Sequence, residues 1–124
     1  MRRDVLLLTE MIDAADQARR LADGITVADL EQDRQRREAL LWNFTVLGEA
    51  AARLSEETKI RFPDVQWQRP ARLRNRVVHG YWSIDVEILY TTATEQLPDF
   101  VADLRRVLAA LTAEADDGAE GAES

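Results

Sequence analysis

The stretch 40–54, LLWNFTVLGEAAARL, decides the fold of this chain. Its apolar residues alternate at intervals of four and three positions, which places them on one face of an α-helix. These residues are Leu40, Phe44, Leu47, Ala51 and Leu54. This register predicts a long helix that packs against a neighbouring helix at a shallow angle. Gly48 and the three alanines after Glu49 make the helix thin, so we expect another backbone to approach it closely there.

Helix signals also precede this stretch. Apolar residues recur at helical spacing over residues 3–22, which predicts a first helix that stops at Gly24. Thr26 and Asp29 have the spacing of a capping box, in which each side chain accepts a hydrogen bond from the other residue's backbone N–H. We therefore expect a helix to begin directly after Thr26.

The C-terminal half carries its own helix signals. A third helix is predicted at about 67–79, with Gly80 as its C-terminal glycine. Ser83 or Asp85 is expected to cap a fourth helix, and Pro98 to kink that helix or to open a fifth. Because no alternating strand pattern competes with these signals, the sequence predicts an all-α bundle of four to five helices.

Length and composition favour a small intracellular protein. A chain of 124 residues has the size of one domain. The absence of cysteine excludes disulfides and thiolate metal sites. No apolar run reaches membrane-spanning length, and Asp4 and Glu10 interrupt the N-terminal segment, so we expect no membrane span, no signal peptide and a cytoplasmic location. Residues 1–112 are predicted to form the domain, and 113–124 an acidic, disordered tail.

The distribution of charge matters more than the net charge of −7. Five of the acids lie in the tail, which contains no base. Arg69, Arg72, Arg74 and Arg76, by contrast, lie within eight residues that include no acid. Because local potential attracts a polyanion more than net charge does, this cluster predicts a surface that binds nucleic acid. The alternative is a solvated helix face without function.

The stretch 72–85, RLRNRVVHGYWSID, holds the residues suited to chemistry. Arg74 and Asn75 precede His79, the only histidine, and Tyr81 follows it. A guanidinium can neutralise charge that develops on a phosphate, while an imidazole can move or orient a proton. The combination therefore suits cleavage of a phosphodiester.

Helix geometry constrains how these residues can meet. Leu73 and Val77 share the face expected to anchor the third helix in the core, and His79 lies about 200° from Val77. Solvent exposure, a subunit interface or a functional site remain open for His79. Arg74 lies about 140° from His79, so the two are not neighbours on one straight helix. A two-fold dimer would let Arg74 of one copy approach His79 of the other.

The pattern Arg-Asn-x-x-x-His-x-Tyr at 74–81 resembles the signature of HEPN domains, specifically the HepT-type ribonuclease toxins of prokaryotic toxin–antitoxin pairs. Gly-Glu-Ala at 48–50 and the Pro…Trp segment at 63–67 resemble flanking segments of that family. Further similarity at 84–87 and 97–98 extends the resemblance over about 1–111. It implies an HEPN-type antiparallel helical bundle that forms a homodimer with a composite active site.

The resemblance also implies roles for the candidate residues. Arg74, His79 and Asn75 would be catalytic, and the other arginines of the cluster would bind RNA. The RNA-binding arginines are Arg69, Arg72 and Arg76. No group of histidine and acids has metal-ligand spacing, so we expect no metal and no cofactor. The 2′-hydroxyl of RNA would then attack the adjacent phosphate.

Aromatic residues near the motif have two interpretations each. Tyr81 either packs over the helix end or, as the resemblance implies, accepts AMP from a small cognate nucleotidyltransferase antitoxin that silences the toxin. Trp67 and Trp82 would stack on bases or lie in the core. Two other functions stay open for the whole chain: a non-catalytic HEPN module that partners a nucleotidyltransferase, and a plain dimeric helical scaffold.

Overall fold

The structure, a computed structural model, describes the chain over residues 2–80 and 85–123, and its side chains over 2–77 and 85–114. Within these ranges every regular element is a helix, which confirms the predicted all-α fold. The elements are α1 Arg2–Ala22, α2 Val27–Gln32, α3 Arg34–Arg53, α4 Glu56–Arg61, α5 Gln68–Gly80, α6 Val86–Thr91, the π-helical turn η2 Thr92–Gln96 and α7 Leu97–Glu123. None of the described helices combines the length and the apolar character needed to cross a lipid bilayer.

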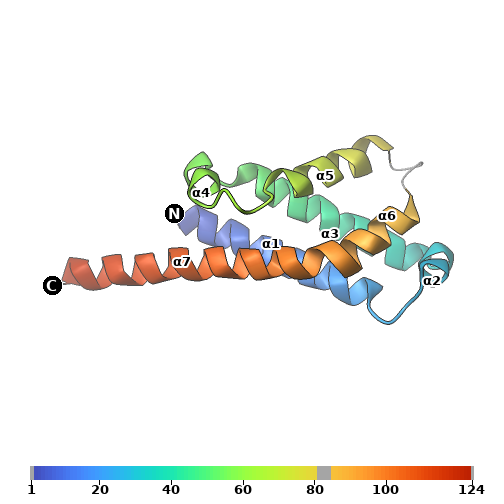
Figure 1. Ribbon diagram of the computed structural model, residues 1–124, viewed down its shortest axis with the longest axis horizontal. Helices are drawn as coiled ribbons and strands as arrows, with labels where there is room; N and C mark the ends of the chain where they lie inside the picture. Colours follow the sequence, from blue (N-terminus) through green and yellow to red (C-terminus); the bar gives the residue numbers. More distant parts are fainter. Residues whose placement is uncertain (1, 81–84, 124) are drawn as a thin grey trace.

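The long helices α1, α3 and α7 form the body of the bundle. α1 packs against both α3 and α7, and α5 lies on α3 (Figure 1). The core between them includes Leu8 of α1, Phe44 of α3 and Leu104 of α7, each with no exposed surface. All five apolar residues of the seam in 40–54 are buried, so the register that predicted this packing is confirmed. Burial of each large apolar side chain contributes about 1.5–3 kcal/mol to folding.

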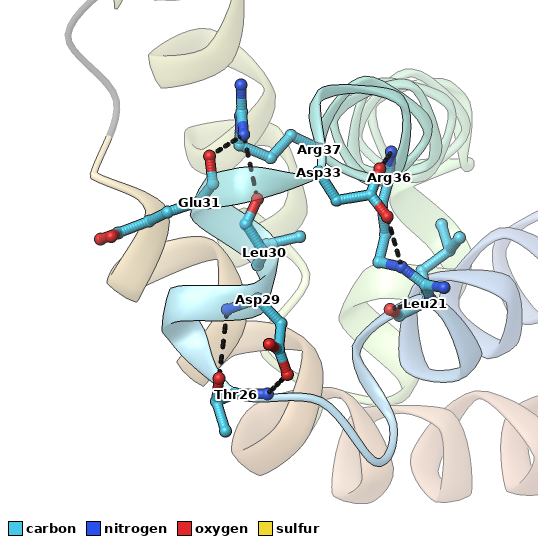
Figure 2. Close-up of polar contacts among 8 residues, drawn as sticks. All are labelled: Leu21, Thr26, Asp29, Leu30, Glu31, Asp33, Arg36 and Arg37. Atoms are coloured by element: carbon cyan, nitrogen blue, oxygen red, sulfur yellow. Dashed lines mark hydrogen bonds and ion pairs between the residues drawn. The ribbon is translucent and has the colours of Figure 1, made fainter.

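The connection between α1 and α3 contains the predicted capping box. Gly24 has a φ of +73°, the left-handed conformation that lets glycine end α1. The backbone N–H of Asp29 donates to Thr26 Oγ1 at 3.1 Å, and the backbone N–H of Thr26 donates to Asp29 Oδ2 at 3.0 Å (Figure 2). The helix that begins there is the short α2. The sequence did not predict the break at Asp33, whose side chain caps α3 by accepting from the backbone N–H of Arg36 at 3.0 Å.

Two arginines of α3 satisfy the ends of the preceding helices (Figure 2). Arg36 Nη1 donates to the carbonyl oxygen of Leu21, near the end of α1, at 2.7 Å. Arg37 Nη1 donates to the carbonyl oxygen of Leu30 at 3.0 Å and also to that of Glu31, at the end of α2. The last carbonyls of a helix have no partner within it and carry partial negative charge, so a guanidinium is well suited to them. These contacts fix the turn between α1, α2 and α3.

A buried carboxylate ties the start of α1 to the end of α3. Asp4 accepts hydrogen bonds from the backbone N–H of Ser55 at 3.1 Å, from Ser55 Oγ at 2.6 Å and from Thr58 Oγ1 at 2.5 Å. Burial acts to raise the pKa of Asp4, but these hydrogen bonds outweigh it and hold the pKa below its ordinary value. Ser55 also caps α4, a short helix that the sequence analysis did not predict.

The chain returns to the bundle through α6 and η2. Asp85 caps α6 by accepting from the backbone N–H of Glu87 at 2.8 Å, which confirms one of the two predicted caps; Ser83 lies outside the described residues. Pro98 is the second residue of α7 and lies two positions after the last residue of the π-helical turn. Proline lacks the N–H needed for the helical hydrogen-bond ladder, and a π turn is one way to absorb such an interruption. Pro98 therefore opens the last helix.

Helix α7 extends beyond the part of it that packs on the bundle. Leu111 is the last buried residue in the described side chains, and α7 continues as a helix to Glu123. In the first turn after Leu111, Glu114 pairs with Arg61 of α4, with Arg61 Nη1 and Glu114 Oε2 2.7 Å apart. Beyond that contact, helix formation relies on the propensity of alanine and glutamate instead of on a core. The predicted boundary at 112 and the disorder of 113–124 stay predictions.

Candidate functional site

Helix α5 carries the predicted motif and runs antiparallel to α3 (Figure 1). Val77 is buried and Leu73 packs against the core, so the two predicted anchors of this helix are confirmed. Because both residues face the bundle, the other faces of α5 are free to present polar side chains. The candidate site therefore depends on which face each polar residue of α5 occupies.

Gly48 is the point at which α3 and α5 come closest. A Cβ atom added to Gly48 would lie 2.3 Å from Arg74 Cβ and 2.7 Å from the carbonyl oxygen of Pro70. Only glycine leaves enough space for this approach. The predicted close approach is thus present, but the neighbour is α5 of the same chain. Gly48 is used within the monomer, so this close approach is not evidence for a dimer.

Arg74 lies against α3 and is held there by Glu49. Arg74 Nη1 lies 2.5 Å from Glu49 Oε1, and the two side chains are 27% and 46% exposed. Arg74 Nε is buried and has no hydrogen-bond partner in the described part of the chain. The Nη edge is therefore the part of this guanidinium that can reach a ligand. The motif in the sequence predicted a role for Arg74 but none for Glu49, which directly follows the glycine of the predicted close approach.

Asn75 occupies a different face of α5. It is exposed and lines a groove of about 740 Å³ between the end of α3, α4 and α5. Lys59, Gln68 and Arg72 contribute polar groups to the same groove. Asn75 is thus accessible to a ligand, in keeping with its predicted role, and no described contact fixes its orientation.

Arg69, Arg72 and Arg76 lie on the far side of α5 from Arg74. Arg72 and Arg76 are each about 160° from Arg74 around the helix. All three line a groove of about 460 Å³ between α5 and the η2–α7 segment, which we call the arginine groove. None of the three makes an ion pair with another described residue. The arginine cluster is therefore divided between two faces, with Arg74 alone on the α3 side.

Acidic residues face the three arginines across the arginine groove. Glu95, Asp99 and Asp103 line its η2–α7 wall. The apolar floor includes Leu73 and Phe100. The acids oppose the attraction of the arginines for a polyanion, because charges of both signs line the same groove. The sequence did not predict this, since even the nearest arginine and acid of the two walls, Arg76 and Glu95, are 19 positions apart in the chain.

The remaining motif residues lie partly or wholly beyond the described range. His79 is in the last turn of α5, but its side chain is outside the described side chains, and Tyr81 and Trp82 are outside the described residues. α5 continues as a helix through Gly80, so positions 74 and 79 keep their separation of about 140° around one helix. The geometry of the Arg74–His79 pair stays a prediction.

Trp67 takes one of its two predicted places, the core. Trp67 is buried, and its Nε1 donates to the carbonyl oxygen of Phe62 at 2.9 Å, so it is a core residue and not a surface for stacking. Trp42, by contrast, is 67% exposed. It lies two turns before Glu49 on the same face of α3. A signal for its exposure was available, because Trp42 falls outside the apolar seam of 40–54.

Comparison with known proteins identifies the family. The sequence model of the family described as "Ribonuclease HepT-like" matches residues 11–107. The chain belongs to the HepT-like ribonuclease family. The match includes Gly48, Glu49, Arg74 and His79 and most of the helical bundle, which agrees with the resemblance drawn from the motif.

Individual relatives of this HepT-like chain carry ribonuclease names. A protein of Methanocaldococcus jannaschii named "Putative RNase MJ0127" is 26% identical over 102 residues, which cover 82% of this chain and 81% of that protein. "Probable ribonuclease HepT" of Thermococcus cleftensis is 25% identical over 91 residues, which cover 73% of this chain and 83% of the relative. No solved structure matches the chain significantly.

Within the described side chains of the HepT-like fold, no group of three or more acidic or imidazole side chains is arranged to hold a metal ion. His79 is outside that set. The expected absence of a metal therefore stays a prediction.

Proposed function

We propose that this chain is an endoribonuclease toxin that cleaves RNA without a metal ion, at a site shared by two copies of the chain. The observation that carries the proposal is the setting of Arg74. Its guanidinium is anchored on α3 with the Nη edge partly exposed, five positions before the only histidine of the chain. Membership of the HepT-like ribonuclease family supports RNA as the substrate.

The proposed chemistry is internal attack by the RNA. His79 takes the proton of a 2′-hydroxyl, and the oxygen attacks the adjacent phosphorus. Arg74 stabilises the additional negative charge on the phosphate oxygens, for which a forked guanidinium is well suited. The bond from phosphorus to the 5′ oxygen then breaks, and that oxygen takes up a proton from water. The products are a 2′,3′-cyclic phosphate and a 5′-hydroxyl. Asn75 orients His79 or contacts the phosphate.

The proposed site needs two copies of the chain. Positions 74 and 79 lie about 140° apart on one continuous helix, so a single α5 does not bring them to one point. A two-fold axis beside α5 would place Arg74 of one copy near His79 of the other. The proposal therefore includes a homodimer, with two equivalent sites.

Arg69, Arg72 and Arg76 are proposed to hold the RNA strand on the far side of α5. Their guanidinium groups are unpaired within the described residues and line one groove. Phosphate contacts of this kind contribute affinity that falls as salt concentration rises. The acids on the opposite wall would limit this affinity and keep the strand on the α5 side of the arginine groove.

Control of the activity is proposed to act through Tyr81. A cognate minimal nucleotidyltransferase would attach AMP to its hydroxyl, and the added phosphate would repel RNA from the same region. Tyr81 lies two positions after His79 in the sequence. Tyr81→Phe removes only the hydroxyl, so we expect it to stay active and to gain no mass when the chain is co-expressed with such a partner.

A second candidate function is a non-catalytic module that binds a nucleotidyltransferase. Two observations favour it. Glu49 already forms an ion pair with Arg74, and three acids line the arginine groove. Both weaken attraction for RNA. Such a module would bind the partner without cleaving RNA.

The test of the proposed function is incubation of the purified chain with total RNA in EDTA. Wild type should produce fragments that end in cyclic phosphate, while DNA of the same sequence stays intact. Arg74→Ala and His79→Ala should each abolish cleavage, and Arg20→Ala, a change of an exposed arginine on α1, should not. Cleavage that persists equally in Arg74→Ala and His79→Ala would overturn the proposal, and absence of cleavage in wild type would favour the non-catalytic module.

A further inference from the structure

Arg74 is set into α3 by two consecutive residues, Gly48 and Glu49. At Gly48, Arg74 Cβ and the carbonyl oxygen of Pro70 occupy the space that any side chain would need. The carbonyl of Pro70 is backbone and cannot rotate away, so a larger residue would move α5 itself. Gly48 therefore fixes where the stem of Arg74 begins.

Glu49 fixes the other end of the same side chain. Its Oε1 accepts from Arg74 Nη1 at 2.5 Å, while Nε is buried and has no hydrogen-bond partner among the described residues. An arginine side chain has considerable rotational freedom, which it loses when it binds a phosphate. With its stem packed on Gly48 and one Nη held by Glu49, Arg74 has lost much of that freedom before any ligand arrives.

The Glu49–Arg74 pair is poorly explained by stability alone. Glu49 is 46% exposed, and ion pairs at such sites contribute little to folding. The pair has a second electrostatic effect, because the carboxylate reduces the attraction between Arg74 and a phosphate. Glu49 thus weakens the binding of the substrate phosphate to Arg74 but fixes the position of the guanidinium. We therefore expect it to favour the transition state more than the binding of substrate.

We propose that Glu49 is the positioning residue for Arg74, orienting its Nη edge toward the scissile phosphate of RNA. This inference rests on the proposed ribonuclease function. Orientation favours the transition state, whereas the negative charge of Glu49 opposes binding of the substrate. Removal of the carboxylate should therefore lower kcat while KM stays constant or falls. A merely structural role would instead raise KM and lower thermal stability.

The test compares Glu49→Gln with a matched variant on the same helix. Glu38 of α3 also pairs with an arginine, since its Oε1 lies 2.9 Å from Arg34 Nε, and its side chain is 45% exposed. Both substitutions remove one charge and keep the side-chain volume. Glu49→Gln should lower kcat about tenfold without raising KM, and Glu38→Gln should leave kcat within about twofold of wild type. An unchanged kcat in Glu49→Gln, or equal losses in both variants, would overturn the proposal.

A second measurement does not depend on ribonuclease activity. NMR of the arginine guanidinium groups reports how fast each Nη pair rotates, and the Arg74 signal is the one that disappears in Arg74→Lys. Rotation at Arg74 should be slower in wild type than in Glu49→Gln and equal in wild type and Glu38→Gln. Equal rotation in wild type and Glu49→Gln would overturn the positioning role. If wild type cleaves no RNA but this rotation difference is present, the proposed function fails while the positioning of Arg74 stands.

Discussion

The two sides of α5 present arginine in different ways. On the α3 side, Arg74 is packed on Gly48 and paired with Glu49, with its Nε buried. On the other side, Arg69 and its neighbours in the arginine groove are unpaired within the described residues. A fixed guanidinium is suited to stabilising charge at one point, and unpaired ones are suited to holding a chain of phosphates. The same residue type can thus serve two functions on one helix.

Among these predictions, Gly48→Ala should cause the largest loss of stability and cleavage, because it acts on the α3 side of α5. The new methyl group would overlap Arg74 Cβ and the Pro70 carbonyl, so α5 must shift away from α3. We expect a loss of about 1–3 kcal/mol in the free energy of unfolding, as for other overpacked sites. Cleavage should fall more than tenfold, since a displacement of about 1 Å at a catalytic group costs on the order of 100-fold in rate. Chemical denaturation and initial rates measure the two effects.

Gln35→Ala is the control for that experiment, because Gln35 is exposed near the start of the same helix. It should change neither quantity. If Gly48→Ala keeps wild-type stability and activity, α5 does not depend on glycine at this point and the α3 side of the comparison is wrong.

The next largest effect should come from replacing the buried carboxylate of Asp4. This change should alter the free energy of unfolding and leave the candidate site in place. Its pKa is held below the ordinary value of about 4, so its contribution to stability is full above that value and is lost as pH falls through the lowered pKa. Asp4→Asn should cost about 1–3 kcal/mol near neutral pH, because Ser55 and Thr58 lose a charged acceptor. Urea unfolding between pH 3 and 7 should show the difference shrinking below pH 4. A constant difference over that range would contradict the assignment.

Changes of charge in the arginine groove should alter RNA affinity by less than Gly48→Ala alters the rate of cleavage. Replacing Arg69 and Arg76 by glutamine should reduce RNA affinity by a few-fold each and make binding less dependent on salt. Replacing Glu95 or Asp99 by its amide should raise affinity, since each removes a negative charge that faces the arginines. Titration of a 2′-deoxy-substituted RNA at several salt concentrations measures this without cleavage. RNA affinity should fall in the arginine variants and rise in the acid variants. A change in the same direction in both groups would contradict the proposed RNA contacts.

Deletion of 113–124 should have the smallest effect. The last described buried residue is Leu111, and the deleted segment includes Glu114, whose exposed pair with Arg61 is worth at most about 1 kcal/mol. The midpoint of thermal unfolding should therefore change little, and RNA affinity should rise slightly because five acids are removed. A large loss of stability would mean that the end of α7 is part of the domain.

Much of this fold could be predicted because its signals are local. The seam of 40–54, the Thr26–Asp29 capping box and the stop at Gly24 each depend on residues a few positions apart. The short helix α4 was missed, although Ser55 followed by two glutamates is a start signal. The break at Asp33 is harder to predict, since the sequence on both sides of it favours helix.

The candidate site was predicted less completely, for a physical reason. The motif gave Arg74, but its pairing with Glu49 joins residues 25 positions apart and requires the packing of α5 on α3. The small residues around Gly48 correctly indicated close approach, yet periodicity alone does not specify which backbone approaches. The acids facing the arginine groove lie on another element for the same reason, so the arginine cluster looked more basic in sequence than it is in space.

The central claim is that Arg74 acts with His79 of another copy, and mixing two inactive variants tests it most directly. Arg74→Ala and His79→Ala are purified separately, mixed in equal amounts, and given time to exchange subunits. If the site is composite, the mixture should recover roughly a quarter of wild-type activity, because half of the dimers are mixed and each contains one complete site. A mixture that stays as inactive as its components, although mass analysis shows that subunits have exchanged, would contradict the account.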